Sequence, residues 1–161
     1  MTLAGTAAPP LGRRDIIRDM TSGPPLLAAE AYLSAMTEFG IDAIYATSGT
    51  DFPSIAEAYA RAPARGWQLP EALVCPHENL AVAMAHGHAL VTGTPQAVMV
   101  HVSVGTSNMV AGAMNAARDQ VPMLLTAGRT PVSEDPEPPG SRSRFIHWAQ
   151  EMFDQAGQLR E

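Results

Sequence analysis

Short apolar runs alternate along this chain with longer segments in which apolar residues recur at helical spacing. Four apolar runs have the length of buried strands: 41–47, 72–75, 97–102 and 123–126. Four intervening segments have a helical pattern: 26–39, about 50–62, 80–91 and 105–118. Strands that alternate with helices are typical of a parallel sheet covered by helices on both faces. The sequence therefore predicts one three-layer α/β domain.

The two ends of the chain have a different character. Residues 1–25 are rich in Ala, Gly, Pro and Thr around Arg13-Arg14-Asp15, so we expect a disordered leader before a domain that spans 26–161. The Ser48-Gly49-Thr50-Asp51 turn is expected to cap the helix that follows it. Near the other end, we expect a loop over 131–144 and a final amphipathic helix over 145–158.

Composition excludes some classes of partner and favours a reducing compartment. With 161 residues, 46% of them hydrophobic and 16% charged, the chain can form a single core. A net charge of -6, without a basic cluster, argues against nucleic acid. No apolar run is long enough to span a membrane, and no signal peptide is evident. The single cysteine, Cys75, cannot form an internal disulfide, so we expect a buried thiol and a cytoplasmic protein.

Candidate site residues follow the strands of the predicted sheet. In open parallel sheets, ligands bind where strands end and helices begin. Three segments are expected at that edge: 47–50, 76–78 and 101–106. We therefore expect Glu78, His101 and Thr50 to lie close together. A carboxylate that opens a helix, as Glu78 does here, is often only a favourable charge at the helix N-terminus, and the alternative is a functional acid.

Several motifs resemble one known family of domains. They are His77-Glu78-Asn79, Gly105-Thr106-Ser107-Asn108, and the apolar segment that runs from Val121-Pro122 to Gly128. Together they resemble the N-terminal, pyrimidine-binding domain of thiamine diphosphate-dependent enzymes, over roughly residues 25–160. The resemblance is strongest to 2-oxo acid decarboxylases such as benzoylformate decarboxylase, and acetolactate synthases are more distant. It implies an α/β fold and a thiamine diphosphate site.

The resemblance also implies roles for individual residues. Glu78 would hydrogen-bond the aminopyrimidine ring of the cofactor and thereby help its exocyclic nitrogen to take the thiazolium proton, as a catalytic and cofactor-binding residue. Gly105 and Asn108 match the Gly-x-x-Asn helix start of the family and would lie at the cofactor. His101 stands where the benzoylformate decarboxylase branch has a histidine that faces the substrate, which implies a catalytic proton transfer. A histidine that is hydrogen-bonded only within the fold is the alternative.

The turn after the first predicted strand also has two interpretations, one functional and one structural. Ser48, Gly49 and Thr50 occupy the place of the family's Asn-Pro-Gly-Ser segment and would contact cofactor or substrate. Their other interpretation is ordinary turn and cap chemistry.

Partners of the domain follow from the same resemblance. Enzymes of this family bind the diphosphate and its magnesium ion through a separate domain with a Gly-Asp-Gly motif, and this motif does not occur here. We therefore expect a fragment or split subunit, C-terminally truncated by one strand and helix, that is inactive without a diphosphate-binding domain and acts on a small 2-oxo acid. The small residues of 81–85 and 111–114 favour a homo-oligomer, since these helices meet across a subunit interface in the family.

Other functions have weaker support. His77-Glu78 begins like a zinc protease motif, but Ala81 stands where the second histidine is required. His86 and His88 are two residues apart on a helix and face different sides, so no metal site is expected. Ser103 lies in a near match to Gly-x-Ser-x-Gly, which leaves a serine hydrolase as an alternative, with Asp135 and His147 as weak partners. A non-catalytic α/β binding or interaction module is the third possibility.

Overall fold

The computed structural model describes residues 26–129 and 152–160. In chain order, its elements are α2 (Ala28–Glu38), β1 (Ala43–Ala46), α3 (Pro53–Arg65), β2 (Glu71–Val74), α4 (Glu78–Thr92), β3 (Gln96–Val100), α5 (Val102–Arg118), β4 (Met123–Ala127) and the 3₁₀ helix η1 (Ala156–Leu159). No helix in these two ranges is long and apolar enough to cross a membrane. The predicted leader and the predicted loop over 131–144 lie outside the described residues.

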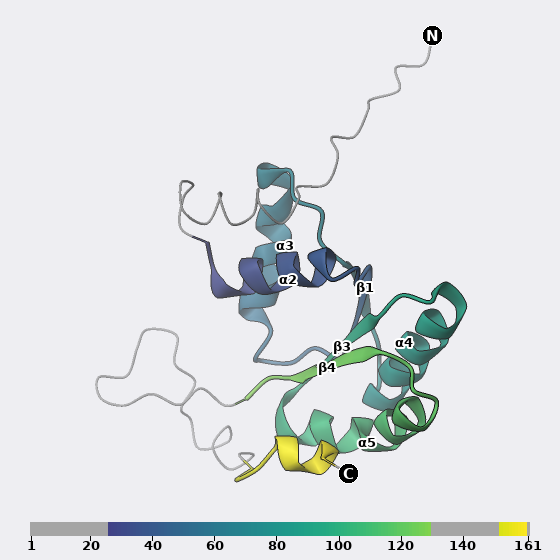
Figure 1. The fold of residues 1–161 in the computed structure, drawn as a ribbon. Helices are drawn as coiled ribbons and strands as arrows, with labels where there is room; N and C mark the ends of the chain where they lie inside the picture. The colour runs from purple at the N-terminus through teal and green to yellow at the C-terminus, as the bar shows by residue number, and fades with distance from the viewer. Residues whose placement is uncertain (1–25, 130–151, 161) are drawn as a thin grey trace.

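The four strands form one parallel sheet in the order β2-β1-β3-β4. Ile44 of β1 pairs with Ala72 of β2 on one side and with Ala97 of β3 on the other, so β1 lies between its two successors in the chain. The two helices α2 and α3 cover one face of the sheet, and α4 and α5 cover the other (Figure 1). The predicted three-layer α/β architecture is therefore confirmed.

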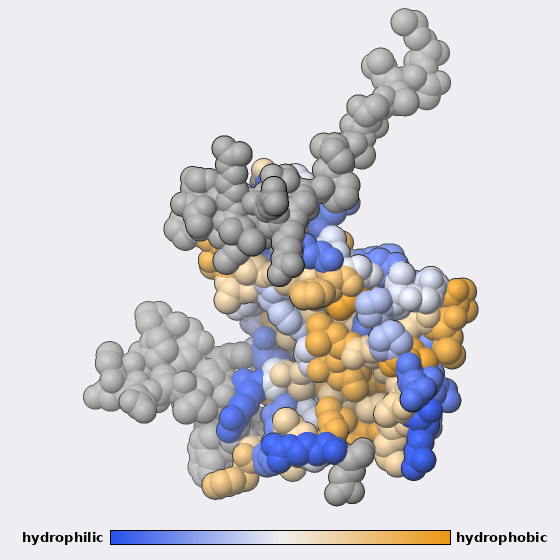
Figure 2. Space-filling view, in the orientation of Figure 1, coloured by the Kyte–Doolittle hydropathy of each residue, from blue (hydrophilic) through white to orange (hydrophobic). Residues whose placement is uncertain are grey.

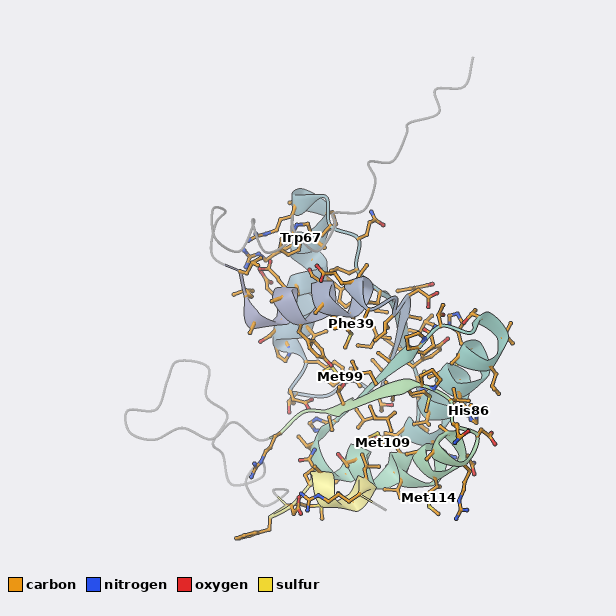
Figure 3. The ribbon with its side chains drawn as sticks, in the orientation of Figure 1. Phe39, Trp67, His86, Met99, Met109 and Met114 are labelled. Carbon is orange, nitrogen blue, oxygen red and sulfur yellow. The ribbon has the colours of Figure 1, made fainter. Side chains whose placement is uncertain are left out.

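Two apolar clusters, one on each face of the sheet, form the core. On the first face, Leu33 and Met36 of α2 pack with Ala58 of α3 against Ile44 and Met99. On the second face, Ala81, Val82 and Ala85 of α4 and Met109 of α5 pack against Tyr45 and Val98. Met99 and Met109 lie on opposite sides of the strands (Figure 3). Successive residues of β1 and β3 thus pack on opposite faces, which explains why β1 and residues 97–100 of β3 are apolar.

Helices α2 and α3 are joined by a buried ionic cluster. Glu30 is fully buried, and its Oε1 lies 3.2 Å from Nε of Arg61 and 3.5 Å from Nε of Arg65. Its Oε2 accepts a hydrogen bond of 2.8 Å from the backbone N–H of Leu27, just before α2. One carboxylate therefore caps α2 and ties it to α3.

Helices α4 and α5 approach each other closely at Gly112. A β-carbon built on Gly112 would lie 2.7 Å from Cγ1 of Val82 and 2.9 Å from Oδ1 of Asn79. Part of the small-residue pattern that we assigned to a subunit interface thus serves packing within the chain. The outer sides of the same helices remain exposed at Ala83 and Met114, so association stays a prediction.

Two predicted helix starts are wrong. Helix α3 begins at Pro53, and no side chain of the 48–51 turn caps it, because the carboxylate of Asp51 is bonded to His101 instead. Helix α5 begins at Val102 and not at Gly105. The chain changes direction at Val102 itself, which has a φ of 40°. No separate turn over 101–104 therefore precedes the helix.

The predicted helix over 145–158 is also wrong in its described part. Residues 153–155 form turns, and only the short η1 follows them. The side chain of Asp154 accepts a 3.0 Å hydrogen bond from the backbone N–H of Gly157, and such a local bond competes with α-helix. Residues 145–151 lie outside the described part of the chain.

Candidate functional site

Loops that follow β1, β2 and β3 converge at the carboxyl edge of the sheet. Backbone hydrogen bonds continue beyond the strands there, from Thr47 N–H to the Met99 carbonyl (3.0 Å) and from Cys75 N–H to the Ala46 carbonyl (2.8 Å). The residues that we predicted for the site follow directly: Gly49 after β1, Glu78 after β2 and His101 after β3. All three segments therefore lie at the same edge.

Glu78 is the first residue of α4 and is directed toward α5. The cap of α4 is supplied by the preceding residue, since Nδ1 of His77 accepts a 3.1 Å hydrogen bond from the backbone N–H of Asn79. The Glu78 side chain is therefore not needed as a cap, and its Oε2 accepts a 3.0 Å hydrogen bond from Nδ2 of Asn108. Glu78 is only 8% exposed. This bond joins two of the predicted site residues, one from each helix.

The second oxygen of Glu78 faces Gly105. A β-carbon on Gly105 would lie 3.4 Å from Oε1 of Glu78 and 3.0 Å from Cβ of Val100, so it would press on Val100 and would fill the space beside the carboxylate. Within 26–129 and 152–160, no hydrogen-bond donor reaches Oε1. Oε1 is not one of the fully buried oxygens that lack a partner, so it remains accessible, which makes this position suited to a ligand that donates a proton.

His101 forms a close pair with Asp51, a residue that sequence reasoning assigned only to a turn. Nδ1 of His101 lies 2.6 Å from Oδ1 of Asp51, and the Asp51 side chain is 4% exposed against 28% for His101. A β-carbon on Gly49 would meet Nδ1 and Cγ of His101 at 2.3 Å, so the imidazole packs directly on the Gly49 backbone. Both residues stand after predicted strands, but the sequence did not show that β1 and β3 are neighbours.

The remaining predicted residues of this edge make no direct link to the two pairs. Ser48 and Thr50 are exposed, and in the part of the chain that is described no hydrogen bond joins either hydroxyl to Glu78 or His101. The Ser103 side chain lies in the buried first turn of α5. The hydrolase alternative stays a prediction, because its partners Asp135 and His147 lie outside the described residues.

The C-terminal segment 152–160 lies against the start of α5, beside this edge (Figure 1). Nε2 of Gln155 donates hydrogen bonds of 2.9 Å to Oγ1 of Thr106 and to the carbonyl of Gly128. Ser107 adds a 2.5 Å hydrogen bond from its hydroxyl to Oε1 of Gln158. Sequence reasoning missed these contacts, since they join residues 27 to 51 positions apart.

Other titratable side chains are engaged in the fold. Burial raises the pKa of the Cys75 thiol above its ordinary value, as expected for an inert structural cysteine. His86 and His88 of α4 each lie near a surface carboxylate, Asp119 at 3.1 Å and Asp42 at 3.7 Å. Among the described residues, no three His, Cys, Asp or Glu side chains are grouped so as to hold a metal ion.

Residues 27–157 match the family described as thiamine pyrophosphate enzyme, N-terminal TPP binding domain. The chain belongs to this family. The match spans the described elements from α2 to β4 and includes Glu78, Gly105, Asn108 and His101. The resemblance inferred from the sequence motifs is confirmed, and membership implies the use of thiamine diphosphate.

Relatives with known names fall into two groups. The acetolactate synthase-like IlvX of Mycobacterium tuberculosis is 31% identical over 101 residues, which is 62% of this chain and 18% of that protein. The benzoylformate decarboxylase of Pseudomonas aeruginosa is 40% identical over 53 residues, which is 33% of this chain and 10% of that enzyme. The chain thus matches less than a fifth of the length of these relatives.

Solved structures agree on the fold. A thiamine diphosphate-dependent 4-hydroxybenzoylformate decarboxylase from Rhodococcus jostii superimposes with a TM-score of 0.51 at 20% sequence identity, over 65% of this chain and 19% of that chain. At this identity the similarity establishes the architecture alone.

Proposed function

We propose that this chain supplies the aminopyrimidine half of a thiamine diphosphate site, in a 2-oxo acid decarboxylase or an acetolactate synthase-like enzyme. The observation that supports the proposal best is the carboxylate of Glu78, which is 8% exposed, held by Asn108 and open at Oε1. Gly105 leaves space beside that oxygen. A ring nitrogen that donates or shares a proton would complete the hydrogen bonding of the carboxylate.

In this proposal the chain's own residues orient the ring and handle protons. When bound, thiamine diphosphate supplies the electron sink for carbanion chemistry. Glu78 holds or receives a proton at Oε1, and Asn108 fixes the plane of the carboxylate through Oε2. His101, at the same edge, exchanges a proton with a small 2-oxo acid substrate, while the hydroxyls of Ser48 and Thr50 offer further hydrogen bonds.

A second domain or subunit is part of the proposal. The named relatives are more than five times as long as the matched region, and they leave ample chain for a domain that binds the diphosphate and a magnesium ion. We infer that this chain works with such a domain, within a homo-oligomer, and is inactive without it.

A titration of the full chain with an aminopyrimidine fragment tests the proposal. 4-Amino-5-hydroxymethyl-2-methylpyrimidine, added up to millimolar concentration, should shift the backbone amide resonances of Glu78, Gly105 and Asn108. A dissociation constant of about 1 mM corresponds to about -4 kcal/mol, which is reasonable for one or two hydrogen bonds and ring packing.

Two alanine variants give the control. Glu78→Ala should abolish the shifts, whereas Glu57→Ala, at an exposed position of α3, should leave them unchanged. Shifts that persist in the Glu78→Ala variant would place the fragment elsewhere and contradict the proposal.

A further inference from the structure

We propose that Asp51 is a positioning residue for His101: it holds the imidazole in the Nδ1–H tautomer, so that Nε2 presents a lone pair at the carboxyl edge. Only one part of the inference rests on the proposed function, namely that the lone pair of Nε2 exchanges a proton with substrate. The tautomer itself follows from the geometry of the pair.

The contact fixes which nitrogen bears the proton. An ionised carboxylate can only accept hydrogen bonds, so the 2.6 Å contact between Oδ1 of Asp51 and Nδ1 of His101 places a proton on Nδ1. A neutral imidazole has one N–H, and Nε2 is then unprotonated. No hydrogen-bond partner for Nε2 is found among the residues described, and the ring is 28% exposed, so this nitrogen is open to a ligand.

Close packing against bare backbone holds both side chains in place. A β-carbon on Gly128 would lie 1.6 Å from Oδ2 of Asp51, and one on Gly49 would lie 2.3 Å from Nδ1 of His101. Replacement of Gly128 would displace the Asp51 side chain, and replacement of Gly49 would displace the His101 ring. Glycine at both positions is therefore a requirement of the pair and not only of the turns.

Backbone strain supports the same pair. Val102 has a φ of 40°, which is unfavourable for a β-branched residue. In this conformation its N–H points to Oδ2 of Asp51 over 3.4 Å. The strained residue thus turns a second donor toward the carboxylate and starts α5 directly after His101.

The other two histidine–carboxylate pairs of the described chain are different in kind. Asp119 beside His86 and Asp42 beside His88 are 57% and 58% exposed, and each pairs through Nε2 of its histidine. Asp51 is 4% exposed, so its contact with His101 is screened much less by water and salt. These two pairs therefore serve as internal controls.

Nitrogen chemical shifts of the histidine rings in the full chain provide the test. Long-range proton–nitrogen spectra are recorded at a pH at which the imidazole is neutral. They should show His101 with a protonated Nδ1 and an unprotonated Nε2. Asp51→Ala should convert His101 mainly to the Nε2–H form that predominates in free histidine. Asp119→Asn and Asp42→Asn should leave the His101 signals unchanged.

Each result decides the proposal. A wild-type His101 with an unprotonated Nδ1 would overturn it, and so would a tautomer that survives Asp51→Ala. The wild-type measurement alone remains decisive if the variant does not fold. This test needs no cofactor, so its result does not depend on the aminopyrimidine titration. The tautomer proposal can therefore be confirmed when the proposed function fails, and it can fail when the proposed function is confirmed.

Discussion

Helices α4 and α5 hold Glu78 and Asn108. The close approach of the two helices at Gly112 can be tested by comparing a glycine-to-alanine substitution at Gly112 with the same substitution at Gly87. Gly87 lies in the middle of α4 with nothing within 4 Å of a built β-carbon, whereas the β-carbon of Gly112 would meet Val82 at 2.7 Å. Gly→Ala in a helix interior stabilises by about 0.8–1 kcal/mol through backbone entropy. That gain applies at both positions, so the two variants differ only in packing.

The expected effects have opposite signs. Gly87→Ala should stabilise the chain by about 1 kcal/mol. At Gly112, crowding against the buried Val82 and against Asn79 should cost about 2–3 kcal/mol, which exceeds the helix gain and leaves a net loss of about 1–2 kcal/mol. The two variants should thus differ by about 2–3 kcal/mol.

Urea unfolding followed by circular dichroism measures this difference. With a slope of about 2 kcal/mol per molar urea, the midpoints of the two variants should lie about 1–1.5 M apart, with Gly87→Ala the higher. Gly112→Ala should also weaken the aminopyrimidine shifts, because it forces apart the helices that hold Glu78 and Asn108. Equal stabilisation by both substitutions would refute the close approach of α4 and α5.

Three further predictions concern the ionic cluster, the cofactor and association. Glu30→Ala should destabilise the chain by about 3 kcal/mol in the same urea assay, since it leaves Arg65 largely buried without its carboxylate, and a change below 1 kcal/mol would contradict this role. Calorimetry of the chain with magnesium and thiamine diphosphate should show no binding at micromolar strength, about -8 kcal/mol, and a submicromolar constant would mean that the phosphates are held here. Light scattering should show a dimer or larger species, because apolar side chains such as Leu90 are exposed at the end of α4 and apolar surface also lies over β4 (Figure 2). Ala83→Glu should dissociate it without loss of helix, and association that survives this charge would place the interface elsewhere.

Local pattern in the sequence was enough for the architecture and for the place of Glu78 at the start of a helix. The strands were predicted because each is a short apolar run between turn residues, and burial on both faces of β1 and β3 demands such runs. Glu78 was singled out because it stands between a strand and an apolar helix, but this pattern is also that of an ordinary helix-start charge, and only the resemblance to the family favoured a functional role. Its hydrogen bond to Asn108 joins two motifs that carried the resemblance, although the Gly-x-x-Asn segment lies inside α5 and does not open it.

Long-range contacts between polar residues could not be predicted in this way. Asp51 and His101 are fifty positions apart, and they meet only because β1 and β3 are neighbours in the sheet. Strand order is a property of the whole fold, and no spacing within the 48–51 turn reveals it. The positive φ of Val102 was hidden for a similar reason, since a valine gives no local sign that the tertiary structure imposes an unfavourable conformation on it.

The order of the strands also explains why one helix serves both pairs of the candidate site. After β2 the chain crosses over β1, through α4, to reach β3, so that α4 and α5 become neighbours on one face. The first turns of α5 then meet two loops at once: Asn108 reaches Glu78 at the start of α4, and the N–H of Val102 faces Asp51 in the loop after β1. A change that displaces the start of α5 should therefore disturb the Glu78 carboxylate and the His101 tautomer together. The exposed charge of Glu57 on α3, on the other face of the sheet, should affect neither.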